Sequence, residues 1–279
     1  MKKLIFLILI LPLLTSCLKK TAPEKLRIDG SQAREDYGQE IMISPMDNVS
    51  IGSHIITIAA EEENVTYTIS GYFDGQIVTS TKNTVIKLNN AYLENTSGKP
   101  ALRCKAKTEI STAGGSTNYI VSRGRGWAKN AALLGWGGLI LGGSGTLFIN
   151  GKICHGIEAE KVKIKGSGTI YVQGTKRGSA LCCDIFTVEA DKTFSAYFLN
   201  AKNGIKADET ITIASGNFYL YNNEIALKTD FKLDEPDKNH GITITGGSFH
   251  TYKNKILFIT EESAYNNTGA TFTEESDPA

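Results

Sequence analysis

Apolar residues alternate with polar ones in short runs that recur at a fixed distance along the middle of the chain. Ile157, Leu181 and Ile205 follow one another at a constant spacing of about 24 residues, and each opens a similar stretch of sequence. In the first of these stretches the alternating pairs are Ile157/Ala159, Val162/Ile164 and Ile170/Val172. Alternation over so few residues is typical of half-buried β-strands. The pattern therefore predicts three short strands in each repeat.

Strands that recur at such a period favour one all-β architecture. A repeat that cannot bury its apolar side alone stacks on the next one, so equivalent strands pair in register as parallel sheets. We therefore predict a parallel β-helix, a solenoid with three faces and coils of about 24 residues. Residues 231–240 are polar and lengthen one repeat, so they are expected to loop out at a corner. The competing antiparallel sandwich does not explain a constant period.

The N-terminus has the pattern of an export signal. Lys2 and Lys3 precede an apolar core from Leu4 to Leu14, which is too short to span a bilayer permanently. The sequence Leu-Thr-Ser-Cys ending at Cys17 resembles a lipobox, which predicts cleavage before this cysteine and acylation of its thiol. We expect an exported lipoprotein, anchored on the periplasmic or cell-surface side of a bacterial membrane. An ordinary signal peptide that happens to end in cysteine is the alternative.

These observations divide the chain into three parts. Residues 1–16 form the lipoprotein signal peptide, residues 17–39 the lipidated cysteine and a flexible polar tether, and residues 40–279 the β-helix domain. The net charge of +1 becomes about −1 once the two lysines of the signal are removed, so charge gives no reason to expect a nucleic acid partner. The four cysteines after Cys17 fit no zinc or disulfide spacing.

Four carboxylates take one position in successive repeats: Glu160, Asp184, Asp208 and Asp230. At a strand spacing of about 4.8 Å they form a ladder at a corner, where their charges repel one another. A hard divalent cation relieves that repulsion, so the ladder predicts a calcium site. Acids also favour corners for their turn chemistry, and pairing with Lys206 and Lys228 explains them equally well.

Aromatic side chains recur at an outward position of the third strand: Phe148, Tyr171, Tyr219 and His250. Ser195 interrupts this row, with Tyr197 close by. A line of rings at the strand spacing matches the repeat of an extended sugar chain, whose C–H groups pack on ring faces. The row therefore predicts a track for a polysaccharide. Aromatic residues also simply favour exposed strands, and that structural interpretation stays open.

A glycine-rich loop places basic and aromatic side chains together. Arg123, Arg125 and Trp127 follow one another in Arg-Gly-Arg-Gly-Trp, and Trp136 comes soon after. Because arginine pairs bidentately with carboxylates, the loop is a candidate site for uronate groups. Its glycine spacing is no nucleotide fingerprint, since no strand-to-helix context surrounds it. A solvated loop without a ligand is the simpler interpretation.

Several stretches resemble a bacterial family of carbohydrate-binding parallel β-helix proteins. They are Gly-Ile-Lys-Ala-Asp-Glu-Thr-Ile-Thr-Ile (204–213), Gly-Ile-Thr-Ile-Thr-Gly-Gly-Ser-Phe (241–249) and Tyr-Thr-Ile-Ser-Gly (67–71). The resemblance implies a right-handed, pectate-lyase-like superhelix that binds calcium, and binding of acidic or cellulosic plant polysaccharides without cleavage. Members carry two acidic positions per coil, and here His155, Ser179 and Asn203 replace one of them. Half of the calcium ligands that the resemblance implies are therefore missing.

The chain is thus predicted to bind an extended polysaccharide without cleaving it. A uronate lyase on this fold needs calcium and a basic side chain that removes a proton, and Lys206, Lys228 and Arg103 are the candidates near the acidic ladder. No Ser-His-Asp, HExxH or paired-acid signature occurs elsewhere in the sequence. A calcium-dependent lyase is the first alternative. A structural surface protein or adhesin that binds another protein is the second.

Overall fold

The computed structural model describes residues 37, 40–124, 131–230, 241–260 and 265–275. In these ranges the backbone forms 25 β-strands and no helix, which confirms the all-β prediction for this part of the chain. It follows that no helix there is long and apolar enough to cross a membrane. The predicted signal peptide, Cys17 and the polar stretch 231–240 lie outside the described residues.

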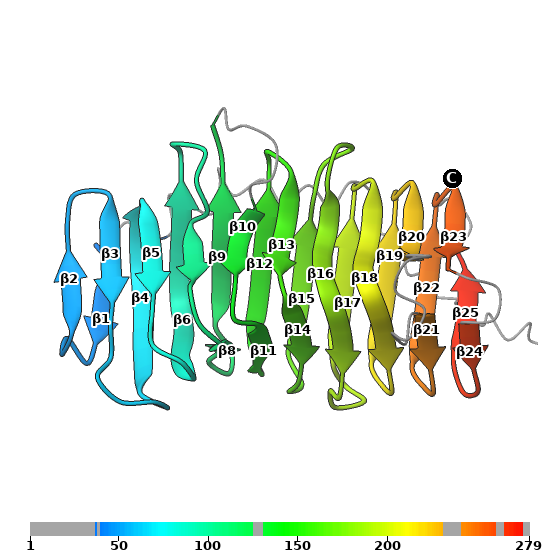
Figure 1. Ribbon diagram of the computed structural model, residues 1–279, viewed down its shortest axis with the longest axis horizontal. Coiled ribbons are helices and arrows are strands. Elements are labelled where there is room, and N and C mark those ends of the chain that lie inside the picture. The colour runs from blue at the N-terminus through cyan, green and yellow to red at the C-terminus, as the bar shows by residue number, and fades with distance from the viewer. Residues whose placement is uncertain (1–36, 38–39, 125–130, 231–240, 261–264, 276–279) are drawn as a thin grey trace, which may run out of the picture.

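Most strands pair in parallel with the equivalent strand of the next repeat, and the pairs form three ladders along the long axis (Figure 1). The first ladder contains β3 (Ile55–Ile58), β5 (Gln76–Thr79), β7 (Leu102–Cys104), β10 (Ala131–Gly135), β13 (His155–Ala159), β20 (Ile225–Thr229) and β23 (Ile256–Ile259). The second contains β8 (Thr108–Thr112), β11 (Leu139–Gly143), β14 (Lys161–Ile164), β21 (Gly241–Ile244) and β24 (Tyr265–Asn267). The third contains β9 (Thr117–Ser122), β12 (Thr146–Gly151), β15 (Thr169–Gln173), β17 (Ser195–Leu199), β19 (Asn217–Tyr221), β22 (Ser248–Tyr252) and β25 (Thr271–Glu274).

Four long strands turn a corner and take part in two ladders. β16 (Ser179–Val188) and β18 (Asn203–Ile213) join the first ladder to the second. β4 (Thr66–Asp74) and β6 (Thr84–Asn95) join the second to the third. Among the described strands only β1 (Met42–Ser44) with β4 and β2 (Val49–Ile51) with β3 pair antiparallel. The antiparallel sandwich considered above is therefore wrong.

The register accounts for the repeat in the sequence. Ile157 pairs with Leu181 and Leu181 pairs with Ile205, so each of these residues lies opposite its counterpart in the next repeat. Elsewhere the spacing varies: Leu102 and Leu133, which also pair with each other, are farther apart in sequence, whereas the paired residues Ile205 and Leu227 are closer. Connections of different length at the corners absorb this variation, and the inward positions stay aligned.

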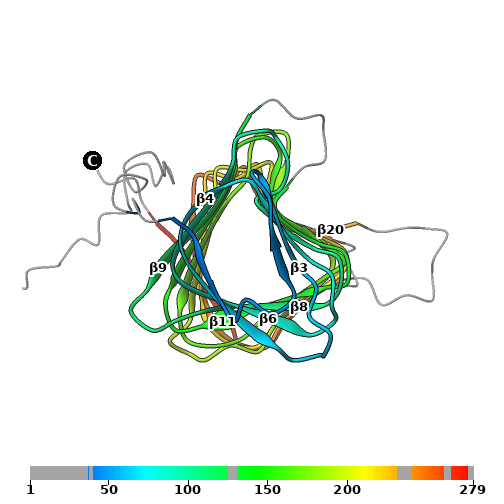
Figure 2. The same cartoon turned by 90° about the vertical axis from the view of Figure 1, so that its left-hand side faces the viewer.

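Viewed along the long axis, the strands lie on the three sides of a triangular outline (Figure 2). The inward residues that the alternation predicts, such as Ile157, Val162 and Ile170, are buried in one apolar core. Cys104 and Cys183 are buried there as free thiols and pack as small apolar side chains. Because burying an aliphatic side chain contributes about 1.5–3 kcal/mol, this core is the main source of stability.

The corner between the first and second ladders brings acidic positions of successive repeats together. The backbone N–H of Asp184 donates to the carbonyl oxygen of Glu160 at 2.9 Å, which keeps these two residues adjacent. In the next repeat β18 has one residue more than β16, since Asp208 and Glu209 lie opposite Asp184 alone. An extra residue of this kind bends a strand and redirects its side chains. The corner therefore carries a concentration of carboxylates.

Candidate functional site

Trp136 stands at this corner with 53% of its surface exposed. It follows the last residue of β10, and its backbone N–H donates to the carbonyl oxygen of Cys104 at 2.9 Å. The guanidinium carbon of Arg103 lies 4.1 Å from the centre of the indole ring, which is a cation–π contact. This contact holds the ring in place while about half of the residue stays open to solvent.

Beside Trp136 the corner is hollowed into a groove of about 360 Å³, which we call the Trp136 groove. Apart from Trp136, its functional groups are four carboxylates and two thiols: Glu158, Glu160, Asp184, Asp208, Cys182 and Cys183. Carboxylates accept hydrogen bonds from hydroxyl groups, and an indole face packs against C–H groups. A sugar ring offers both kinds of group, so the Trp136 groove has the chemistry to hold one.

Lysines stand between two of the four carboxylates of the predicted acidic ladder. The Lys206 ammonium lies 2.9 Å from Asp208 Oδ1 and 2.6 Å from Asp230 Oδ2. Lys228 Nζ lies 2.6 Å from the other oxygen of Asp230. Within the described ranges, no group of three or more His, Cys, Asp or Glu side chains is arranged to hold a metal ion. Pairing with lysine, which the sequence left open, thus accounts for Asp208 and Asp230.

These ion pairs set the protonation of the corner. Burial lowers the pKa of Lys206, but hydrogen bonds to Asp230 and Asp208 outweigh it and hold that pKa above its ordinary value. Burial raises the pKa of Asp230, yet its contacts with Lys206 and Lys228 outweigh burial and leave that pKa lowered. Each oxygen of Asp230 faces an ammonium group, so calcium would have to displace both lysines to reach it. Calcium binding stays a prediction that rests on the remaining carboxylates.

Eight aromatic rings follow one another in a line on the outer side of the third ladder, stacked from Tyr92 onward and tilted between Tyr72 and Tyr92, and we call them the aromatic row. Its members are Tyr72, Tyr92, Tyr119, Phe148, Tyr171, Tyr197, Tyr219 and His250. From Tyr119 to His250 the centroids of neighbouring rings are 4.2–4.9 Å apart, and their planes differ by 6–15°. The four rings predicted from the sequence all belong to this row, which continues beyond them towards the N-terminus.

The predicted interruption of the row at Ser195 is wrong. Tyr197 pairs with Tyr171 on one side and with Tyr219 on the other, whereas Ser195 pairs with Thr169. The step from Tyr171 to Tyr197 is longer than the regular repeat, so counting by the repeat selects the wrong residue. The additional residues lie in the connection from β16 to β17.

Stacking determines what the aromatic row offers to a ligand. The inner rings pack both faces against their neighbours, so sugar C–H groups cannot lie on those faces. Ring edges and hydroxyl groups are what these half-buried residues present. Burial and the neighbouring Tyr219 and Tyr171 raise the pKa of Tyr197, so its hydroxyl keeps its proton at neutral pH. The row is thus a hydrogen-bonding edge and not a series of open platforms.

Arg123, predicted as a uronate ligand, is engaged by a buried acid. Its Nε lies 2.6 Å from Oε1 of Glu94, whose side chain is only 3% exposed. Its Nη2 also donates to the hydroxyl of Tyr92 at 3.2 Å. This geometry gives Arg123 a role inside the fold. Arg125 and Trp127, the other members of the predicted basic loop, lie outside the described residues.

Other side chains pack against the aromatic row near its two ends. Tyr37, from the predicted tether, places its ring 5.8 Å from that of Tyr92. At the other end, Nδ1 of His250 lies 3.1 Å from Glu275 Oε1, and the hydroxyl of Tyr221 donates to Glu275 Oε2 at 2.6 Å. The row is therefore integrated into the fold along its length.

The Trp136 groove is not apparent from the periodicity, because Trp136 lies outside the alternating pairs. The sequence groups Trp136 with the loop arginines, yet its cationic neighbour is Arg103 from the preceding repeat. The pairing register of β10 with β13 does reveal the position of Trp136. Gly135 pairs with Ala159, so Trp136 takes the position that Glu160 takes in the next repeat. An indole at the head of a carboxylate ladder marks the site.

Comparison with known proteins finds similarity to a carbohydrate-binding family model and to a polysaccharide lyase-like structure. A family model described as a carbohydrate-binding domain-containing protein matches residues 52–179, less than half of the chain, and Trp136 lies in that segment. No curated protein matches. Among solved structures, the polysaccharide lyase-like protein from C. thermocellum, in its gadolinium derivative, is similar with a TM-score of 0.53 and 21% identity, over 82% of this chain and 88% of that one. The two proteins share their fold.

Proposed function

We propose that this protein binds polysaccharide without cleaving it and is built as a right-handed parallel β-helix. The parallel ladders with one strand per repeat and the triangular outline in Figure 2 support this architecture. The fold shared with the polysaccharide lyase-like protein supports it as well. The match of residues 52–179 to a carbohydrate-binding domain supports the class of ligand.

The observation that carries the proposal is an exposed Trp136 beside a groove lined with carboxylates. Arg103 supports the indole, and the open part of the ring receives the C–H face of a sugar. Hydroxyl groups of the same sugar donate to Glu158 and Glu160. A groove of about 360 Å³ lies within the size range of small-ligand pockets, so it holds part of a longer chain.

A glycan array identifies the polymer, and titration calorimetry with oligomers of increasing length then tests the site. Trp136→Ala should weaken binding about tenfold or more, as expected for an aromatic anchor. Tyr265→Ala removes another exposed ring, 38% exposed in β24, and should leave the affinity unchanged. Equal affinity of wild type and Trp136→Ala would rule out this groove. The absence of any carbohydrate hit would favour the adhesin or scaffold alternative.

The chemistry of the corner supports binding over cleavage. Lys206 and Lys228 are paired with Asp230, and the raised pKa of Lys206 keeps it charged, so it is a poor base. Burial raises the pKa of Cys182 to about 12, which leaves its thiol protonated and weakly nucleophilic. Arg103, the third candidate base, contacts Trp136. Unsaturated products from a uronate polymer would establish the lyase alternative instead.

The aromatic row is a second candidate surface for the same polymer. Its edge runs through many repeats, so only an extended chain reaches several of its hydroxyl groups at once. Tyr171→Ala/Tyr219→Ala should weaken long oligomers more than short ones if the row takes part in binding. Unchanged affinity at every length restricts binding to the Trp136 groove.

We further propose that the protein is exported and carries lipid on Cys17. The support is the lysine pair, the short apolar core and the small residues that precede this cysteine. Cys17→Ser should abolish labelling by a palmitate analogue and leave the precursor uncleaved. Cys154→Ser is the control, because its buried thiol has no part in the signal. Labelling that persists in Cys17→Ser contradicts the proposal.

A further inference from the structure

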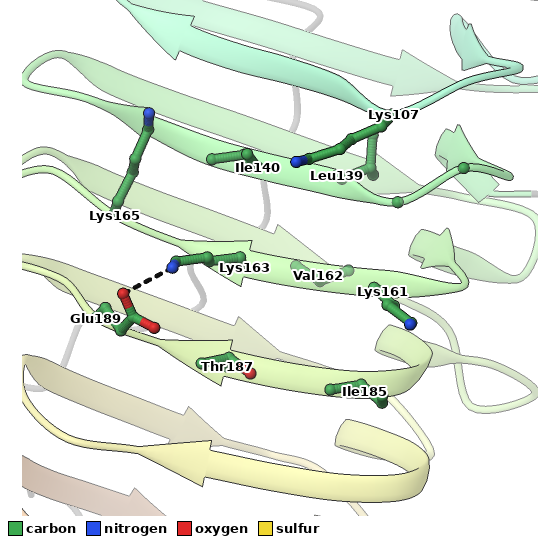
Figure 3. A pocket seen from close by; sticks show the side chains of 12 residues that line it. Lys107, Leu139, Ile140, Lys161, Val162, Lys163, Lys165, Ile185, Thr187 and Glu189 are labelled. Carbon is green, nitrogen blue, oxygen red and sulfur yellow. Dashed lines mark ion pairs between the residues drawn. The ribbon is translucent and has the colours of Figure 1, made fainter. Parts of the chain in front are cut away.

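A second groove, the lysine groove, lies on the second ladder (Figure 3). Its lining adjoins that of the Trp136 groove. Its volume is about 550 Å³, and its charged lining consists of Lys107, Lys161, Lys163, Lys165 and Glu189. At the boundary between the two grooves, one residue lines the Trp136 groove and the next residue in the chain lines the lysine groove. The boundary runs between Trp136 and Gly137 in one repeat. It runs between Glu160 and Lys161 in the next, so an extended ligand can occupy both grooves at once.

Of the four lysines in this groove, Lys107 and Lys161 are available to an anion, and the other two are paired. Lys163 and Lys165 each pair with a carboxylate, at 2.6 and 2.7 Å. Figure 3 shows the first of these pairs, with Glu189, at one end of the groove. Lys107 and Lys161 are exposed, and neither forms an ion pair within the part of the chain that the structure describes. The groove therefore offers uncompensated positive charge.

The floor between the lysines is apolar. Leu139 is buried there, and Ile140 and Ile185 are half-buried. A side chain at Gly137 would lie 2.5 Å from the backbone nitrogen of Lys107, so glycine lets the two repeats approach closely. An apolar floor flanked by cations suits a ligand that has C–H groups on one side and a negative charge at its edge.

We propose that the lysine groove binds the negatively charged group, a carboxylate or a sulfate, of a saccharide whose neighbouring unit stacks on Trp136. This inference rests on the proposed function and adds the charge and orientation of the ligand to it. Lys107 and Lys161 attract the anion, while the carboxylates of the Trp136 groove repel it. The charged unit therefore lies on the lysine side of the corner and the hydroxyl-bearing unit on the acidic side.

A sugar fits this arrangement better than an anionic membrane surface does. A broad negative surface that reaches the lysines also meets the exposed carboxylates of Glu160 and Glu189, which repel it. A single charged substituent enters the groove and avoids them. The local alternation of charge thus selects a ligand that carries isolated negative groups on an otherwise neutral backbone.

Calorimetry of the purified protein with three probes tests the proposal: galacturonate oligomers, methyl esters of the same oligomers, and sulfated galactan oligomers. Lys107→Met/Lys161→Met should weaken the charged oligomers about tenfold or more and leave the methyl esters unchanged. Added salt should weaken the charged oligomers on wild type but not on this variant. Lys176→Met/Lys202→Met removes two exposed lysines outside the groove and should change nothing.

Loss confined to galacturonate assigns a carboxylate, loss confined to the sulfated oligomers assigns a sulfate, and either result supports the proposal. It is overturned if wild type shows no preference for charged over esterified oligomers, or if the control variant loses as much affinity. A loss in Trp136→Ala would then still support the proposed function, so the two failures are distinguishable. Lysine-dependent binding of anionic phospholipid vesicles, without a preference for charged sugar, assigns the groove to a membrane and also overturns the proposal.

Discussion

The rings of the aromatic row and the indole of Trp136 differ in how much ring face they expose to solvent. In the row, rings 4.2–4.9 Å apart from Tyr119 to His250 pack face to face, so each ring is the partner of the next. Trp136 has no aromatic neighbour among the described residues and is 53% exposed, with one guanidinium against its ring. Aromatic residues that recur at the strand period stack on one another and stabilise the fold, whereas a ring outside the period keeps surface for a ligand.

The largest effect is expected at the N-terminal end of the row, where Arg123 serves the fold. Arg123→Met leaves the buried Glu94 carboxylate without its cation, so the free energy of unfolding should fall by about 3–5 kcal/mol. Urea denaturation measures the change. Arg123→Met/Glu94→Gln also removes the buried charge and should recover part of the loss. A loss under about 1 kcal/mol is typical of an exposed pair and would return Arg123 to the candidate ligands.

Substitutions in the aromatic row should change stability, whereas substitutions in the Trp136 groove should change ligand affinity. Tyr197 stacks on Tyr171 at 4.4 Å and on Tyr219 at 4.2 Å. At about 0.5–1.5 kcal/mol per aromatic pair, Tyr197→Ala should lower the free energy of unfolding by about 1–3 kcal/mol. Tyr197→Phe keeps the stack and should keep the stability. Trp136→Ala should reduce the affinity for the ligand with little loss of stability. If Trp136→Ala instead lowers stability and Tyr197→Ala lowers affinity, the row binds the ligand and Trp136 supports the fold.

The sequence predicts the ladders well because burial fixes them. Inward residues such as Ile157 and Leu181 must stack, and a constant period is enough to pair them. Corners are harder, because a longer connection shifts the count and hides Tyr197. Contacts between repeats, such as Arg103 with Trp136, depend on how outward side chains align across the ladder. Periodicity does not encode that alignment, nor the choice between stacked rings and open ones.

Calcium distinguishes the two interpretations of the acidic corner. The Lys206 ammonium bridges Asp208 and Asp230, so Lys206→Met removes the cation between these carboxylates and leaves Lys228 paired with Asp230. This variant should melt below wild type in a chelator, and calcium should stabilise it by about 1 kcal/mol more than it stabilises wild type. Lys176→Met controls for the loss of one exposed charge. An equal response to calcium in all three proteins would show that lysine does not occupy the place of a metal.

The smallest effect expected is a change in folding stability with pH in the acid range, which arises from Asp230 at the corner and not from Tyr197 in the row. The folded-state pKa of Asp230 is lowered, since its contacts with Lys206 and Lys228 outweigh burial. A lowered pKa contributes stability above the unfolded value of about 3.9, and that contribution is lost as pH falls through the folded pKa. Tyr197 has a raised pKa, so its contribution is present below about pH 10 and is lost only as pH rises further.

The stability difference between wild type and Asp230→Asn in the acid range therefore reports on the ion pairs of the corner. Because the Asp230 side chain is 32% exposed, solvent screening limits its contribution to under about 1 kcal/mol. Asp230→Asn should be less stable than wild type near neutral pH, and the two proteins should converge as pH falls through the lowered folded-state pKa, where the wild-type carboxylate becomes protonated. Denaturation of both proteins across this range measures the convergence. A stability difference that stays constant with pH would mean that Asp230 acts through the geometry of the turn and not through its charge.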